Sequence, residues 1–359
     1  MDIMRFYKGE EFSAYEYFGA HLTEKGTVFR VYAPNASKVS VIGDFSKWEE
    51  LPMEAVNDGR SYELTVPAAE EGQRYKYRIY DTKSDFIDHC DPYGFGMEVR
   101  PGTCSVIRSI EGYRFGDGDW LRQRSDCRDK PLNIYEVHLG SWKRRSDEEG
   151  WFSYSEIADE LIDYVSELGC NYIELMPLNE HPCDESWGYQ STGFFAPTSR
   201  YGTPLQLMEL VDKCHRRGIG VIIDFVPVHF AVDHYALTEF DGTRLYEYPA
   251  DDIGYNEWGS RNFNHSKGEV RSFIQSAADY WLSVYHFDGL RMDAVRNMIY
   301  WNGDEHRGEN RTAIQFLKDM NSGLKARHPT AIISAEDSSA YPKVTAPVFD
   351  GGLGFDYKW

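Results

Sequence analysis

The chain has 359 residues, of which 42% are hydrophobic and 27% charged, a composition typical of a globular protein with room for two domains. Its 38 basic and 58 acidic side chains give a net charge of −20, which argues against nucleic-acid or anionic-membrane partners and suits a neutral substrate. The N-terminus has no apolar signal segment and no run of transmembrane length occurs, so we expect a cytoplasmic protein.

The first third of the chain has the pattern of a β-rich domain. Four short runs of β-branched and aromatic residues, separated by turn residues, predict strands at residues 28–32, 39–42, 62–66 and 75–80. We therefore expect an immunoglobulin-like β-sandwich over residues 1–110. Residues 111–130, rich in Arg, Asp and Gly, are expected to form a linker.

From residue 131 onward, strand-like and helix-like runs alternate. The expected strands are residues 132–139, 171–176, 219–226, 287–292 and 331–335, with a sixth at 348–355. The expected helices are residues 154–168, 204–217, 268–285 and 311–327. Such alternation is typical of βαβ units in a parallel sheet. A closed (β/α)8 barrel needs eight strands, so residues 131–359 predict an incomplete barrel with strands 1–5 or 1–6 and a C-terminus that falls short of closure.

Six cysteines are scattered along the chain, and none forms a C-x-x-C pair. A zinc site or thioredoxin-type redox chemistry is therefore not indicated, and we expect free thiols. The cysteines are Cys90, Cys104, Cys127, Cys170, Cys183 and Cys214.

Two acidic residues, Asp293 and Glu336, stand at the ends of two apolar runs. An acid at the C-terminal end of a parallel strand points into the mouth of an α/β barrel, and two such acids are the minimum needed to cleave a glycosidic bond. Arg291 shares a strand face with Asp293. Because a guanidinium favours the charged form of a neighbouring carboxylate, Arg291 is expected to keep Asp293 ionised, as a nucleophile requires.

A third strand-like run ends in Asp224, followed five residues later by His229. Taken alone, these residues favour an aspartate that caps a turn and a histidine packed in the core. Asp293 or Glu336 alone could equally serve a helix N-terminus. Acids at three strand ends, with an arginine on one of the strands, favour one shared site over three coincidences. The weakly periodic residues 227–267 are typical of a functional loop.

These motifs make the chain similar to a known family. Residues 224–229, 289–294 and 335–338 resemble three signature regions of the α-amylase superfamily. Further segments resemble the 1,4-α-glucan (glycogen) branching enzymes within it, namely residues 135–142, 174–182 and 186–202 in the barrel and residues 33–48 and 91–93 in a glycogen-binding-type sandwich. The resemblance covers about residues 17–359 and implies a β-sandwich followed by a (β/α)8 barrel.

The resemblance also implies roles for individual residues. Asp293 is expected to be the nucleophile and Glu336 the general acid/base. Asp224, His229 and Tyr189 are expected around the sugar before the scissile bond, with Tyr189 stacked on its ring.

Two further aromatic residues have less direct expected roles. Trp187 is expected either as a second sugar platform or as a loop anchor. Tyr135 is expected to support the nucleophile from behind. The superfamily's third catalytic acid has no counterpart after Glu336 in this chain, so it is expected beyond Trp359.

The function implied is the transfer of a chain cleaved from an α-1,4-glucan to a glucan 6-hydroxyl, forming an α-1,6 branch of glycogen. The chemistry requires no metal or organic cofactor, and the partner is α-1,4-glucan or glycogen. Two alternatives stay open: a related α-glucan hydrolase, such as an isoamylase-type debrancher or a trehalohydrolase, or a glucan-binding protein without catalysis. The 359-residue polypeptide itself is expected to have little branching activity. The transferred chain length, the natural glucan and the oligomeric state are left open.

Overall fold

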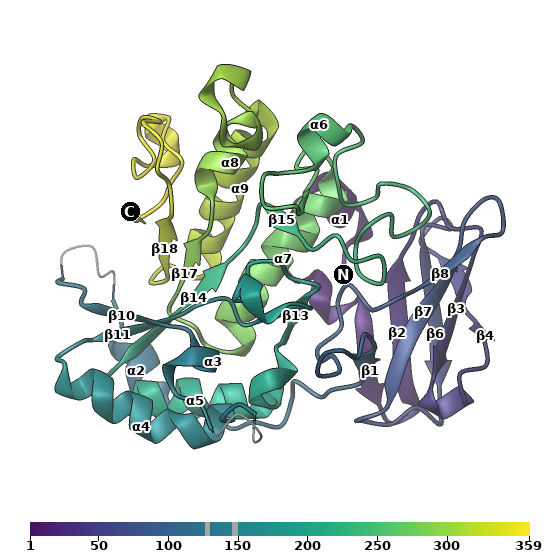
Figure 1. Cartoon of the computed structure of the whole chain (residues 1–359), viewed down its shortest axis with the longest axis horizontal. Helices are drawn as coiled ribbons and strands as arrows, with labels where there is room; N and C mark the ends of the chain where they lie inside the picture. Colours follow the sequence, from purple (N-terminus) through teal and green to yellow (C-terminus); the bar gives the residue numbers. More distant parts are fainter. Residues whose placement is uncertain (126–129, 146–149) are drawn as a thin grey trace.

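The computed structural model describes residues 1–125, 130–145 and 150–359 (Figure 1). An antiparallel β-rich part lies at one end of the molecule and a parallel αβ part at the other. Cys127 and residues 126–129 of the expected linker lie outside the described residues, and the domain boundaries at 110 and 130 stay predictions. The five described cysteines are free thiols. Within the described ranges, no helix is both long and apolar enough to cross a bilayer.

The expected β-sandwich is confirmed, as two antiparallel sheets packed around aromatic side chains. One sheet has the order β1 (Gly19–Thr23), β2 (Gly26–Tyr32), β6 (Ser61–Val66), β5 (Glu54–Val56). The other has the order β4 (Leu51–Pro52), β3 (Lys38–Gly43), β7 (Arg74–Tyr80), β8 (Phe86–His89), with β9 (Ser105–Val106) also paired to β7. Along β7 the buried side chains alternate with half-exposed ones, so Tyr75, Tyr77 and Ile79 face the core.

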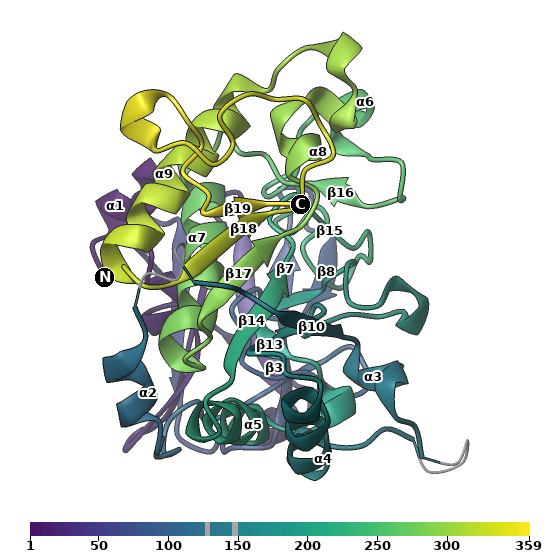
Figure 2. The ribbon, with the colours of Figure 1, turned by 90° about the vertical axis from the view of Figure 1, so that its left-hand side faces the viewer.

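The αβ part contains a parallel six-stranded sheet that corresponds to an incomplete barrel (Figure 2). Its order is β10 (Ile134–Val137), β11 (Tyr172–Leu175), β14 (Gly220–Phe225), β17 (Gly289–Met292), β18 (Ile332–Ala335), β19 (Tyr357–Lys358). Strands β10 and β19 are its two edges.

The first five barrel strands lie where the sequence predicts them, but the sixth does not. Residues 348–355 contain a 3₁₀ helix, η7 (Val348–Asp350), and then a turn in which Gly351 and Gly354 have φ of 82° and 81°. A left-handed backbone of this kind cannot continue a strand. The sixth strand forms instead at β19, where Ser334 and Ala335 pair with Tyr357 and Lys358.

Four long helices accompany these strands as predicted: α4 (Tyr154–Glu167), α5 (Pro204–Arg216), α7 (Gly268–Val284) and α9 (Arg311–Arg327). Two of them begin at capping boxes, in which Ser153 pairs with Glu156 and Thr203 with Gln206. The shorter helices are α1 (Ile3–Lys8), α2 (Gly118–Gln123), α3 (Leu139–Trp142), α6 (Asp251–Gly254) and α8 (Val295–Ile299). Helix α1 packs against α7 and ties the N-terminus to the αβ part.

The two faces of the parallel sheet differ in character. The face toward the helices carries Ile173, Val221 and Leu290 in the main hydrophobic core. On the opposite face, Ile222 and Ile332 form a small apolar cluster. Nearer the C-terminal ends, that opposite face becomes charged.

Two antiparallel ribbons follow the C-terminal ends of β11 and β14. They are β12 (Asn179–Glu180) with β13 (Gly193–Pro197), and β15 (His229–Phe230) with β16 (Arg261–Asn262). The segments that they support surround the mouth of the sheet.

Candidate active site

The two acids singled out in the sequence open into one pocket of about 990 Å³. Asp293 directly follows β17 and Glu336 directly follows β18. The backbone N–H of Asp293 donates to the carbonyl of Phe225 at 2.9 Å, and that of Glu336 to the carbonyl of Met292 at 2.9 Å. Both acids therefore continue the ladder of hydrogen bonds between the parallel strands, which fixes their positions at the mouth of the sheet.

Arg291 joins two carboxylates at this mouth. Its Nη1 donates to Asp224 Oδ1 at 2.7 Å and to Asp293 Oδ1 at 2.8 Å. Asp224 and Arg291 are paired in register on neighbouring strands, so their side chains share the inner face. The Tyr189 hydroxyl donates to Asp224 Oδ2 at 2.6 Å. The expected contact between Arg291 and Asp293 is therefore present, and Asp224 lies in the same network.

The charge state of this network differs from the expectation that Arg291 keeps Asp293 ionised. Burial, reinforced by the charge of Asp224, raises the pKa of Asp293 to about 7, although Arg291 acts in the opposite direction. Burial likewise raises the pKa of Asp224 to about 6. The physical reason is that one guanidinium is shared by two buried carboxylates. Asp293 therefore loses its proton close to neutral pH.

A third acid, Glu174 of β11, lies buried on the inner face of the sheet. Burial and the nearby charge of Asp224 raise the pKa of Glu174 to about 8. Its side chain is therefore neutral at pH 7, which limits the negative charge packed behind the pocket. Sequence reasoning missed this residue, because it stands within an apolar run.

Glu336 is oriented by a tight turn that follows Asp293. The residue between the acid and helix α8 is Ala294, whose φ of 54° places it in the left-handed region. This conformation costs a non-glycine residue about 1 kcal/mol or more. It directs the Ala294 N–H at Glu336 Oε2, 2.9 Å away, while the Val295 N–H donates to the Glu336 carbonyl at 2.9 Å. Strain at Ala294 thus accompanies the alignment of the two acids.

His229 lines the pocket as a neutral imidazole, since burial lowers its pKa to about 4. Its Nε2 lies 3.0 Å from the carbonyl of Tyr189 and must carry the hydrogen. Its Nδ1, left as an acceptor, has no partner among the described residues. The ring of Trp258, 45% exposed, lies 5.3 Å from the imidazole and also lines the pocket. Trp258 was missed as a site residue, although the long segment that carries it was recognised.

Trp187 lies beside the main pocket. It is 54% exposed, has a φ of 52°, and lines a second pocket of about 320 Å³ together with His138, whose ring centroid is 6.0 Å away. The exposed ring suits a sugar platform and its contact with His138 suits a loop anchor, so both expected roles stay predictions.

Tyr135 does not support Asp293. On β10 it shares a face with Val137, which is part of the main core on the helix side of the sheet. Its ring packs against Tyr164 of α4 at 5.6 Å, and its hydroxyl accepts a hydrogen bond from Trp142 Nε1 at 3.1 Å. The expectation failed because the alternation along β10 directs Tyr135 away from the barrel interior.

Several further residues line the main pocket, and most come from the segments above the sheet. They are Cys183, Glu185, Ser186, Gln190, Glu257, Arg296, Asn297, Asn302, Gly303, Asp304 and Ser338. Across the described ranges, no group of three or more His, Cys, Asp or Glu side chains is arranged to hold a metal ion.

Comparison with known proteins places these features in context. Residues 17–94 match the model of carbohydrate-binding module 48, the isoamylase N-terminal domain, and residues 141–251 match the alpha amylase catalytic domain. The whole chain is 45% identical to the 1,4-alpha-glucan branching enzymes GlgB of Fusobacterium nucleatum subsp. nucleatum and of Bacillus caldolyticus. It spans only 59% and 55% of the length of these two relatives.

Among solved structures, the catalytic module of the multi-modular glycogen-degrading pneumococcal virulence factor SpuA superposes with a TM-score of 0.72 at 18% identity. The match covers 93% of this chain and 52% of that chain. At this identity the likeness supports the fold alone.

Proposed function

Because this chain belongs to the α-amylase superfamily, we propose that it acts in 1,4-α-glucan branching, cleaving an α-1,4-glucan and transferring the released chain to a glucan 6-hydroxyl during glycogen biosynthesis in the cytoplasm. The observation that carries the proposal is the convergence of Asp293 and Glu336 on one pocket, with Arg291 bound to Asp293. The identity of 45% to branching enzymes supports the branching reaction over other reactions of the superfamily.

The reaction proceeds by two displacements at the anomeric carbon. Protonated Glu336 gives its proton to the leaving glycosidic oxygen while ionised Asp293 attacks, so that the glucan chain is held as an ester on Asp293. Deprotonated Glu336 then takes the proton of an acceptor 6-hydroxyl, whose oxygen displaces Asp293 with net retention of configuration. Asp293 leaves as a carboxylate and Glu336 ends protonated, so the site returns to its starting state.

The surrounding residues suit a neutral, hydroxyl-rich substrate. The pocket of about 990 Å³ is at the large end of the usual range of ~300–1,000 Å³ for ligand sites, as a glucan chain requires. We assign Asp224 and neutral His229 to the hydroxyls of the sugar before the scissile bond. Tyr189, held by its hydrogen bond to Asp224, offers its ring as a stacking surface.

The first alternative, a glucan hydrolase, would use water as the acceptor, and a debrancher would also cleave α-1,6 in place of α-1,4 linkages. The second, a glucan-binding protein without catalysis, would not use the acids. Linkage and reducing-sugar analysis of amylose and of branched glycogen after prolonged incubation with the protein separates all three. New α-1,6 linkages in amylose with little reducing sugar are expected. Reducing sugar from either glucan without new branches would establish the hydrolase, and two unchanged glucans would favour the binding protein.

A further inference from the structure

A contact between the sandwich and the pocket-lining segment 183–189 has no role in the chemistry described above. We propose that Arg100, on the sandwich side of the molecule, is a positioning residue that holds segment 183–189 in its glucan-binding conformation through an ion pair with Asp184. The positioning effect concerns the fold alone, whereas its consequence for glucan binding rests on the proposed function.

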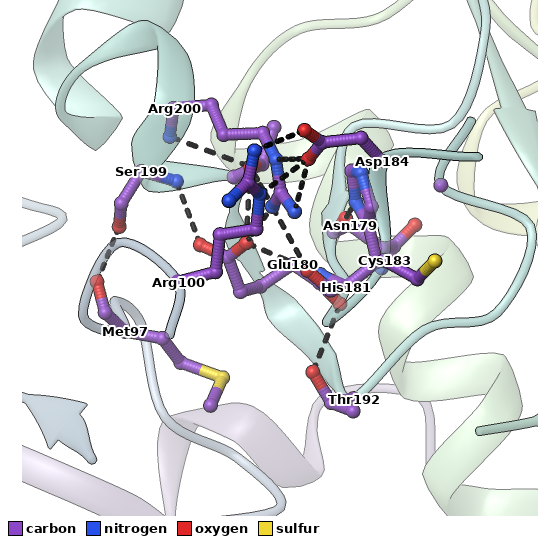
Figure 3. A network of polar contacts seen from close by, with 12 residues as sticks. Met97, Arg100, Asn179, Glu180, His181, Cys183, Asp184, Thr192, Ser199 and Arg200 are labelled. Carbon is purple, nitrogen blue, oxygen red and sulfur yellow. Dashed lines mark hydrogen bonds and ion pairs between the residues drawn. The ribbon is translucent and has the colours of Figure 1, made fainter. Parts of the chain in front are cut away.

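The contact between Arg100 and Asp184 is bidentate (Figure 3). Arg100 Nε donates to Asp184 Oδ1 at 2.7 Å, and Nη2 donates to Oδ2. A fork of two parallel hydrogen bonds fixes both the position and the plane of the carboxylate. The pKa of Asp184 is lowered to about 2, chiefly by the hydrogen bonds from Arg100, so its carboxylate is ionised at neutral pH.

Asp184 is also held by Arg200, a buried residue of the αβ part. Arg200 Nε donates to Asp184 Oδ1 at 2.8 Å, and Arg200 Nη1 donates to Glu180 Oε1 at 2.7 Å and to the His181 carbonyl at 2.8 Å. The side chains of Arg200 and Glu180 are 1% and 4% exposed. Asp184 therefore lies between a buried arginine of the αβ part and an arginine brought by the sandwich.

The backbone that follows Asp184 connects it to the main pocket. The short helix η3 (Asp184–Ser186) begins at this residue, and its neighbours Cys183 and Glu185 line the pocket. The Trp187 N–H donates to the Asp184 carbonyl at 3.1 Å, and the Tyr189 N–H donates to the Ser186 carbonyl at 3.0 Å. Tyr189 in turn reaches Asp224. A shift of Asp184 thus moves the aromatic residue assigned to the substrate.

The exposure of the pair decides what its loss should do. The Arg100 and Asp184 side chains are 41% and 37% exposed, and pairs of this kind contribute little to global stability. The expected effect is therefore a local loosening of segment 183–189 with an almost unchanged unfolding temperature. That combination distinguishes positioning from a merely structural salt bridge.

The test compares R100M, D184N and the double variant with the control R78M. Arg78 makes a similar bidentate pair with Asp88, at 2.7 and 2.9 Å, but within the sandwich and away from the pocket. Amide hydrogen exchange in segment 183–189, followed through the Trp187 and Tyr189 N–H groups, should become at least tenfold faster in R100M and D184N, with no further increase in the double variant. R78M should leave it unchanged. Unchanged exchange in R100M would overturn the proposal.

Maltoheptaose binding to the same proteins separates this inference from the proposed function. Several-fold weaker binding by R100M, with R78M equal to the parent protein, is expected. If exchange accelerates but R100M binds as tightly as the parent, the link between positioning and binding is refuted. If exchange accelerates and even the parent protein fails to bind the sugar, the positioning role stands and the glucan function fails.

Discussion

The shared guanidinium at the mouth of the sheet makes a quantitative prediction for Asp224→Asn. The replacement is nearly isosteric and removes one negative charge. Its single oxygen can accept from Arg291 Nη1, and its NH2 group can donate to the Tyr189 hydroxyl in place of the oxygen that accepted from it. Both carboxylates bind the same Nη1, at 2.7 and 2.8 Å, so their nearest oxygens are at most about 5.5 Å apart. At an effective dielectric constant of ~20, two charges at this distance repel by about 3 kcal/mol, or about two pKa units.

The first step needs ionised Asp293, and this requirement sets the direction in which the pH profile should shift. Because the charge of Asp224 raises the pKa of Asp293, its removal should lower that pKa from about 7 toward about 5. The acid limb of the activity profile should shift by a similar amount. The maximum rate should fall, because Asp224 is assigned to the substrate. The pH of the acid limb does not depend on that maximum, so its shift can still be measured.

The assay is the rate at which an α-glucosyl fluoride with a second fluorine at C5 inactivates the protein, measured from pH 4.5 to 9. Glu185→Gln is the matched control, since it removes a carboxylate that lines the same pocket but does not contact Arg291. An acid limb that stays near pH 7 in D224N, or an equal shift in E185Q, would refute the electrostatic reasoning.

Three further predictions concern the buried histidine, the helix-facing tyrosine and the open sheet. His215 is buried between two carboxylates, with Nδ1 3.0 Å from Asp117 Oδ2 and Nε2 2.9 Å from Asp288 Oδ2. Burial lowers the pKa of His215, but these two hydrogen bonds outweigh burial and raise the pKa to about 8. His215 should contribute about 2 kcal/mol of stability below pH 6.5 that is lost as the pH rises through 8, and urea unfolding should show this loss in the parent protein but not in H215Q. Y135F should keep glucan transfer within about twofold of the parent rate, since Tyr135 faces α4; a loss of tenfold or more in the linkage assay would restore its expected support of the nucleophile. A polypeptide of residues 1–359 should branch amylose on the order of 10²–10³-fold more slowly than the relative from Bacillus caldolyticus and should associate through the edges β10 and β19 in light scattering; a comparable rate would contradict this expectation.

Much of the frame that carries the site follows from sequence periodicity. The four long helices and the first five barrel strands lie where the alternation of apolar runs predicts them, because buried parallel strands and amphipathic helices have distinct patterns. The placement of Asp293 and Glu336 follows directly, since a residue just after a parallel strand must lie at its C-terminal edge.

The failures have local causes. The apolar residues of 348–355 resemble a strand, but glycines with positive φ turn the chain before it can pair. Tyr135 was assigned from a resemblance in sequence, whereas the alternation along β10 decides which face its side chain occupies.

Electrostatic and long-range features were not accessible from sequence. The proximity of Arg291 to Asp293 follows from their spacing. That Arg291 also binds Asp224 depends on the register of β14 and β17. The ion pair between Arg100 and Asp184 joins residues 84 positions apart, and no local sequence pattern predicts it.

The role of Asp293 as the nucleophile can be tested directly. Incubation with the same 5-fluoro α-glucosyl fluoride, followed by proteolysis and mass spectrometry, should reveal one glycosyl adduct on the peptide that contains Asp293. The adduct should be lost in D293N and retained in E185Q. An adduct on Asp224 or Glu336, or α-1,6 branching of amylose by D293N at the parent rate, would contradict the assignment.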